Sequence, residues 1–299
     1  MRVLVTGTSG TVGAQVAREF LAHGYAVRGF DKAPPRGDDL KQGIEVIYGD
    51  LTARFDLLRA TEGCDAIAHL AAIPNPGHSD EEMFAVNVTG TQQLLAAAEA
   101  HGIRRVALAS TCCAFGIFFA LHPFDPQYLP MDEKHPNLPQ DLYGLSKLLN
   151  EETAAAYTRR SGMTTVSLRL TSVVRLNEDN RWRRWRKNNL QSDAERADDL
   201  WSYIDRRDAA RAFRLAIENA REGTNTTAII AARDSMTTLD IRDLVRKHFP
   251  ALAEQVADLA PTACLYDTKT AEDAFGFVAE HLWRDEPFFD DVLTVRDFK

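Results

Sequence analysis

The sequence contains few cysteines, and their spacing excludes several kinds of site. The four are Cys64, Cys112, Cys113 and Cys264, and no two of them form a CxxC pair or stand beside paired histidines at metal-ligand spacing. Adjacent cysteines such as Cys112 and Cys113 rarely bridge each other, and small buried side chains are the commoner use of such a pair. We therefore expect no disulfide scaffold, no metal site, and a reduced, cytoplasmic setting.

Long apolar runs and an excess of positive charge are also missing. No run is long enough to span a bilayer, and the first residues pass directly into a strand pattern without a secretory leader. The formal net charge is -8, which disfavours an anionic membrane surface or a nucleic acid as the partner. A chain of 299 residues can bury a large core, so we expect one large α/β unit with at most a small appendix.

A glycine-rich turn near the start of the chain indicates a nucleotide site. An apolar run at Val3–Val5 predicts a strand, and a helical pattern at Ala14–Leu21 follows three glycines at three-residue spacing. Such a turn lets bare backbone approach a dinucleotide pyrophosphate, while the unpaired N–H groups of the helix start meet the anion. The residues of the turn that we expect to contact the cofactor are Gly7, Ser9, Gly10, Thr11, Val12 and Gly13.

An aspartate at the end of the second predicted strand indicates which cofactor binds. Tyr25–Phe30 has strand character, and Asp31 follows it. A carboxylate there accepts hydrogen bonds from the adenosine ribose hydroxyls and repels a 2′-phosphate, which selects NAD over NADP. Two alternatives remain open, since Asp31 can serve as a turn residue and nearby Lys32 and Arg36 can weaken the discrimination.

Further predicted strands alternate with helices along the first two thirds of the chain. This order implies right-handed crossovers and a doubly wound (Rossmann) parallel sheet in an α/β fold, with a small carboxyl-terminal lobe. We expect a dinucleotide-binding domain over 1–170 and a substrate-specificity loop and lobe over 171–299, with some segments of the second part returning to the sheet. The expected later strands are Glu45–Tyr48, Ala66–His69, Val106–Ser110 and Thr164–Leu170, and the expected long helices are Glu81–His101 and Tyr143–Arg159.

The order of short motifs resembles one enzyme family. The motifs are TGTSGTVG, Asp31, GDL at 49–51, HLAA at 69–72 and NVTGT at 87–91, and together they resemble the extended short-chain dehydrogenase/reductase family of nicotinamide-dependent sugar epimerases and dehydratases. The resemblance implies that Asp50 and Leu51 bracket the adenine, and that Asn87 braces the helix behind the active site and contacts the cofactor. It also implies that Leu70, Ala71 and Ala72 line the cofactor. Taken singly, His69 and Asn87 can also be buried residues that satisfy local groups.

The segment after the fifth predicted strand supplies a hydroxyl group. The family resemblance places on Thr111 the hydroxyl that hydrogen-bonds the reacting oxygen, with Ser110 as the reserve and as a cofactor contact. A structural alternative is that both hydroxyls only satisfy backbone groups where the strand ends.

Tyr143 and Lys147 stand four residues apart at the start of a predicted helix. This spacing puts the phenol and the ammonium on one helix face, where the cation can lower the pKa of the tyrosine. We predict that Tyr143 is the catalytic acid/base. Lys147 also holds the nicotinamide ribose in the resembled family.

The stretch 171–200 is where enzymes of this kind differ in substrate. It holds the run Arg181–Lys187, in which arginines and tryptophans interleave. The run can clamp an anion or a ring, or it can form a basic surface helix. Ser172 and Arg181 match in spacing the substrate-contacting serine and arginine of uronate dehydrogenases, although Cys112, Cys113 and Pro74 stand where that group has polar contacts.

The carboxyl-terminal third predicts three more helices and a strand. The stretch 201–210 is expected to begin a helix, with Asp205 as the cap at its start. A strand and a helix that begins near Thr238 are expected within 227–249, and a short helix over Lys269–Phe275. No flexible linker separates these segments from the rest, so we expect the lobe to pack on the sheet.

These observations predict an NAD enzyme that oxidises a secondary hydroxyl of a sugar or nucleotide sugar. Tyr143 removes the proton, Thr111 steadies the developing carbonyl, and the outcome is either epimerisation or release of an oxidised sugar, as in a free-sugar or uronate-type dehydrogenase. A module that senses NAD without turnover is a remote alternative. We also expect a homodimer, because the helices Glu81–His101 and Asp141–Arg159 carry apolar residues, such as Leu94 and Leu95, beyond what one sheet contact needs.

Overall fold

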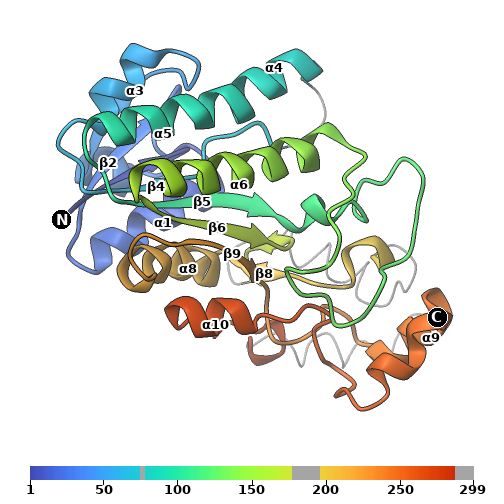
Figure 1. Ribbon diagram of the computed structural model, residues 1–299. Coiled ribbons are helices and arrows are strands. Elements are labelled where there is room, and N and C mark those ends of the chain that lie inside the picture. The colour runs from blue at the N-terminus through green and yellow to red at the C-terminus, as the bar shows by residue number, and fades with distance from the viewer. Residues whose placement is uncertain (75–77, 177–195, 287–299) are drawn as a thin grey trace.

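A parallel sheet of seven strands forms the centre of the computed structural model, which describes residues 1–74, 78–176 and 196–286 (Figure 1). The strand order is β3-β2-β1-β4-β5-β6-β9, so the order reverses between β1 and β4 and opens a crevice at their carboxyl ends. The predicted doubly wound fold is confirmed. The strands are β1 (Arg2–Thr6), β2 (Ala26–Asp31), β3 (Glu45–Tyr48), β4 (Ala66–His69), β5 (Arg105–Thr111), β6 (Thr164–Leu170) and β9 (Asn225–Ile230).

Helices cover both faces of this sheet (Figure 1). On one face lie α1 (Thr11–Ala22), α8 (Arg206–Asn219) and α10 (Lys269–Phe275), and on the other lie α3 (Arg54–Thr61), α4 (Asp80–Phe84), α5 (Gly90–Ala100) and α6 (Leu142–Ser161). The short helix α2 (Asp38–Gly43) connects β2 to β3. Because both faces are covered, successive residues of the inner strand β1 are all buried, as Val3, Leu4 and Val5 show.

The helix expected over Glu81–His101 is interrupted. Between α4 and α5 lies one π-helical turn, Ala85–Thr89, with Asn87 fully buried within it. The Asn87 side chain accepts a hydrogen bond from the Ile73 amide and donates one to the Ile73 carbonyl and one to Ser146 Oγ. The wider π-helical turn points the side-chain amide of Asn87 toward Ile73 and Ser146. The sequence does not indicate this turn, because its apolar residues recur with the ordinary 3.6-residue period of an α-helix.

Segments after residue 170 return to the main sheet. β9 pairs with β6, and α8 packs on α1. A short parallel pair, β7 (Val173–Val174) and β8 (Ile204–Asp205), and helix α9 (Ile241–His248) lie at the carboxyl-terminal edge. Short stretches of 3₁₀ helix occur at η2 (Cys112–Phe115), η3 (Ala197–Asp199), η4 (Pro250–Val256) and η5 (Trp283–Asp285).

The stretch 201–210 is predicted to begin a helix with Asp205 as its cap, and the helix does begin at Arg206, after Trp201 and Tyr203, which are fully buried. Asp205 still caps it, accepting a hydrogen bond from the Arg207 amide at 2.8 Å. The helix expected from Thr238 begins at Ile241, after the cap of Asp240. In the described parts of the chain we find no helix that is both long and apolar enough to cross a membrane.

Candidate active site

The glycine-rich turn between β1 and α1 forms one end of a cavity of about 610 Å³. All six predicted turn residues line the cavity: Gly7, Ser9, Gly10, Thr11, Val12 and Gly13. Gly7 has a φ of +81°, and a Cβ there would lie 2.8 Å from the Ala71 amide nitrogen, so only glycine fits. Helix α1 begins without a side-chain cap or an acidic residue in its first turn. These free N–H groups and the bare backbone fit the pyrophosphate of NAD.

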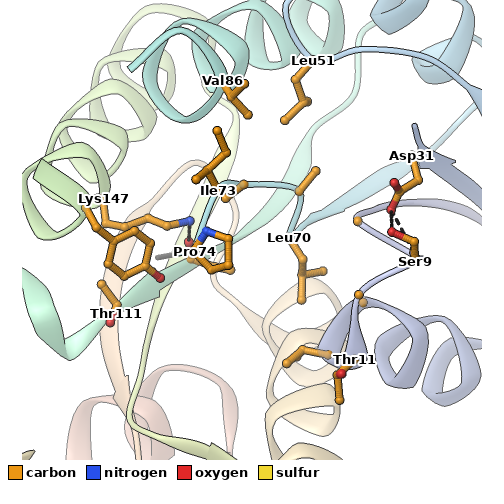
Figure 2. Close-up of a pocket in the computed structure, with 18 of the residues that line it drawn as sticks. Ser9, Thr11, Asp31, Leu51, Leu70, Ile73, Pro74, Val86, Thr111 and Lys147 are labelled. Atoms are coloured by element: carbon orange, nitrogen blue, oxygen red, sulfur yellow. Dashed lines mark hydrogen bonds between the residues drawn. The ribbon is translucent and has the colours of Figure 1, made fainter. Parts of the chain in front are cut away.

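Asp31 lies at the same end of this cavity, opposite Thr111 and Lys147 (Figure 2). Its Oδ2 accepts hydrogen bonds from the amide and the hydroxyl of Ser9, both at 2.8 Å. Two nearby cations could weaken the discrimination against NADP. Lys32 forms an ion pair with Asp50 at 2.8 Å, and Arg36 donates from Nε to the Ser9 carbonyl. The geometry keeps a carboxylate at the adenosine end and fits NAD better than a 2′-phosphate.

The middle of the cavity wall comes from the ends of β3 and β4. Asp50 and Leu51 line it, as do Leu70, Ala71 and Ala72. Asn87 does not line the cavity, because its amide is used on Ile73 and Ser146 behind the wall. This geometry fits the prediction that Asn87 braces the helix behind the active site. It does not fit a direct contact between Asn87 and the cofactor.

Thr111, Tyr143 and Lys147 stand together at the other end of the cavity. Lys147 Nζ donates to the Ala109 carbonyl at 2.9 Å and lies 5.8 Å from the centroid of the Tyr143 ring. Burial lowers the pKa of Lys147 to about 8, and burial raises the pKa of Tyr143 above its ordinary value. The sequence analysis expected Lys147 to lower the pKa of Tyr143. In this structure burial of the phenol raises that pKa instead, and the ammonium is turned toward the Ala109 carbonyl of β5.

A buried ion pair supports this end of the site, and the sequence analysis missed it. Glu151 forms a paired contact with Arg169, with distances of 2.9 and 2.7 Å. Ser110 lines the cavity but donates its hydroxyl to Glu151, which leaves Thr111 as the better placed hydroxyl for substrate. Glu151 follows Lys147 by one further helical turn, and this continued spacing could have identified it.

A second cavity of about 480 Å³ adjoins the first. Thr111 and Tyr143 line both cavities, so they stand where the two meet. Pro74, Cys112 and Cys113 form part of its wall, and burial raises the pKa of Cys113 to about 12, so the thiol is neutral. Further lining residues among those that the structure describes are Phe118, Phe119, Leu170, Thr171, Ser172, Val173, Asp199, Ser202 and Tyr266.

Ser172 lines this second cavity, and it meets an aspartate that the sequence analysis did not identify. Ser172 Oγ lies 3.2 Å from Asp199 Oδ2, and Arg196 donates to the same oxygen from Nε and Nη2 at 3.0 and 2.5 Å. No local pattern indicates this contact, because 27 residues separate the two side chains. Arg181, the other predicted substrate contact, and the basic-aromatic run 181–187 lie outside the described residues.

The chemistry of this site suits one class of enzyme. A nucleotide-binding turn, an acidic second strand end, and a tyrosine and a lysine beside a hydroxyl define a Rossmann-fold oxidoreductase that uses a nicotinamide dinucleotide. The model of the NAD dependent epimerase/dehydratase family matches residues 3–232, and the chain belongs to this family. The predicted family, enzyme class and cofactor, NAD, are thereby confirmed.

Individual relatives agree with this assignment. A UDP-glucose 4-epimerase from Rhizobium leguminosarum bv. trifolii is 28% identical over 81% of this chain and 70% of its own length. A uronate dehydrogenase from Pseudomonas putida is 34% identical, over 57% of this chain and 60% of its own length. The crystal structure of a short-chain dehydrogenase/reductase superfamily protein from Agrobacterium tumefaciens with bound NAD is 26% identical, with a TM-score of 0.71, and covers 99% of this chain and 97% of that one.

Proposed function

We propose that this enzyme transfers hydride between NAD and a secondary hydroxyl-bearing carbon of a sugar or nucleotide sugar. One observation carries the proposal: Thr111 and Tyr143 stand where the cofactor cavity meets the second cavity. A sugar in the second cavity therefore has its reacting hydroxyl beside the phenol and its carbon toward the cofactor cavity. The named relatives act on sugars of both kinds.

Each group has a defined part in this reaction. When bound, NAD supplies the hydride acceptor, and the residues around it are those of the first cavity. Tyr143 takes the hydroxyl proton, and Thr111 hydrogen-bonds the same oxygen as it becomes a carbonyl. Lys147 is fully buried and bonded to Ala109, and it supplies positive charge near the phenol. Glu151, bonded to Ser110 and Arg169, holds α6, β5 and β6 in register around these groups.

The test of the proposed function separates its two outcomes. The enzyme is incubated with excess NAD and with neutral sugars, sugar acids and nucleotide sugars, and both NADH absorbance and product identity are recorded. Stoichiometric NADH indicates a dehydrogenase, as the uronate dehydrogenase relative suggests. Isomer formation without NADH indicates an epimerase. If none of the three substrate classes reacts, the proposed function is wrong.

The first prediction concerns Tyr143. Tyr143→Phe removes the proton acceptor and keeps the ring, so turnover should fall by about 10²-fold or more. NAD affinity should stay within a few-fold, because the ring still fills the same space. Turnover and NAD binding are measured on the same preparation. A variant that keeps near wild-type turnover contradicts the assignment of Tyr143 as the acid/base.

We infer that the enzyme is a homodimer formed through α5 and α6. These helices lie side by side, joined by an ion pair between Glu99 and Arg160 at 2.9 Å. On the outer side of α6, Leu149 is exposed, and Leu145 and Leu148 are half-buried.

We also propose a cytoplasmic location, which is consistent with the four cysteines, all of them free thiols.

A further inference from the structure

Two charged side chains of α6 are bonded to successive residues of β5. Lys147 Nζ donates to the Ala109 carbonyl at 2.9 Å, and Glu151 Oε1 accepts from the Ser110 hydroxyl at 2.5 Å. Residues four apart lie on one face of a helix, so the ammonium and the carboxylate are neighbours. Lys147 and Glu151 are both buried, with 5% and 6% of their surface exposed. Between buried groups a charge is felt more strongly than in water.

A third charged side chain fixes the Glu151 carboxylate in place. Arg169 on β6 donates from Nε and Nη2 to the two carboxylate oxygens at 2.9 and 2.7 Å, and its own side chain is 3% exposed. The guanidinium also lies over the Phe115 ring, 4.6 Å from its centroid. Glu151 is therefore held from two strands, by Ser110 of β5 and by Arg169 of β6.

Other titratable groups also face Lys147 in the part of the chain that the structure describes. The Tyr143 ring lies 5.8 Å from the ammonium, and Cys113 of η2 and His69 of β4 lie close enough to interact with it electrostatically. Burial raises the pKa of Tyr143, raises that of Cys113 to about 12 and lowers that of His69 to about 3, so all three are neutral near pH 8. Burial lowers the pKa of Lys147 to about 8, and the Glu151 carboxylate opposes that fall.

We propose that Glu151 is a positioning residue of the reaction, and that its charge, held by Arg169, keeps Lys147 in the ammonium form beside the bound cofactor. The inference rests on the proposed function, in which Lys147 supplies positive charge near the phenol. Lys147 uses one of its three protons on Ala109, and as an ammonium it presents the other two as charge-assisted donors. A neutral side chain at 151 could still pack α6 against the sheet, but it could not stabilise this charge.

Binding of the reduced cofactor reports the charge of Lys147. Lys147 lines the cofactor cavity, and NADH carries a negative pyrophosphate but no charge on its nicotinamide ring. NADH should therefore bind the ammonium form more tightly than the neutral amine. By linkage, its affinity should be highest below pH 8 and should fall as the pH rises through the pKa of Lys147.

The experiment measures NADH affinity by fluorescence titration of the purified enzyme from about pH 6 to about pH 10. Lys147→Met should abolish the fall in affinity, which assigns the fall to Lys147. Glu151→Gln keeps the shape of the side chain without its charge, and it should move the midpoint of the fall at least about one pH unit lower. Glu151→Asp keeps the charge on a shorter side chain and should leave the midpoint within about half a pH unit of the wild type.

Two further variants separate charge from packing. Glu152→Gln removes the same charge from the next residue of α6, which is exposed, and it should leave the midpoint within about 0.2 pH units. Glu151→Gln combined with Arg169→Gln replaces the buried pair by two neutral side chains, and it keeps the test open if the single variant does not fold. Because the two charges act on Lys147 in opposite directions, this midpoint should lie above that of Glu151→Gln and below that of the wild type.

The possible outcomes separate the inference from the proposed function, because NADH binding needs no turnover. The inference is overturned by a wild-type affinity that does not fall, by a fall that persists in Lys147→Met, or by a wild-type midpoint in Glu151→Gln or the double variant. An equal shift in Glu152→Gln or in Glu151→Asp also overturns it, since position or packing would then be the cause. If the midpoints move as expected while no sugar reacts, the proposed function is wrong and Glu151 still sets the charge of Lys147.

Discussion

His69, at the end of β4, is held between two threonines in the core. Thr6 Oγ1 accepts hydrogen bonds from the Leu70 and Ala71 amides, so its own proton is left for His69 Nδ1 at 2.8 Å. Thr91 Oγ1 donates to the Asn87 carbonyl and therefore accepts from His69 Nε2 at 3.0 Å. The ring is thus neutral with its proton on Nε2, and burial lowers its pKa to about 3.

This arrangement predicts acid sensitivity. The unfolded chain binds a proton at His69 near its ordinary pKa of 6.5, whereas the folded chain does so only near 3. Between these values the unfolded state carries more protons, so the free energy of unfolding should fall as the pH falls, by up to about 1.4 kcal/mol per pH unit. Urea unfolding across this range should show a shallower dependence in His69→Gln. The exposed control His78→Gln should keep the wild-type slope, and equal slopes in all three proteins would contradict the assignment.

At the scale of the elements, the junction of the glycine-rich turn with α1 leaves no room for a side chain. A Cβ on Gly13 would lie 2.1 Å from the Gly7 carbonyl oxygen, so the helix or the turn must move. Gly13→Ala should therefore cost about 1–3 kcal/mol of stability and weaken NAD binding about ten-fold or more. Gly43→Ala is the matched control, since its Cβ would meet only Leu21 Cδ1 at 3.9 Å. NAD titration and thermal melts check both variants, and an unaltered affinity in Gly13→Ala would show that the turn does not hold the cofactor.

The elements of the sheet could be predicted because each leaves a local mark in the sequence. Apolar runs of strand length alternate with helical patterns, and Gly7, Asp31 and Tyr143 stand at the ends of such runs. The contact between Ser172 and Asp199 leaves no such mark, because it depends on how η3 packs beneath the second cavity. The π turn at Asn87 was also missed, because it follows from hydrogen bonds to Ile73 rather than from the order of polar and apolar residues.

At the scale of the whole molecule, the structure changes which residues test the dimer. Leu94 and Leu95 are fully buried in the core of their own chain, so they do not form a free apolar face. Leu95→Glu would unfold the protein whether or not it is a dimer. Leu149, 36% exposed on α6, is the better probe.

Light scattering at micromolar concentration should give twice the chain mass for the wild-type protein. Leu149→Glu should give the single mass with a nearly unchanged melting temperature, because a carboxylate at a two-fold contact meets its own copy. Leu239→Glu introduces the same charge at a leucine of similar exposure, 38%, away from these helices, and should stay dimeric. A monomeric wild-type protein would contradict the proposed dimer, and a Leu149→Glu variant that remains a dimer would place the interface elsewhere.

The packing of α8 on α1 has a consequence for how the chain is made. Arg214 on α8 forms an ion pair with Glu19 at 2.8 Å, and Glu218 accepts a hydrogen bond from the Tyr25 hydroxyl at 2.7 Å. Phe20 and Phe213 share one apolar cluster beneath this contact. In a nascent chain that still lacks α8, the apolar side of α1 is therefore exposed to water. The packing of the helix that follows the nucleotide turn therefore depends on partners 193 and 195 residues further along the chain.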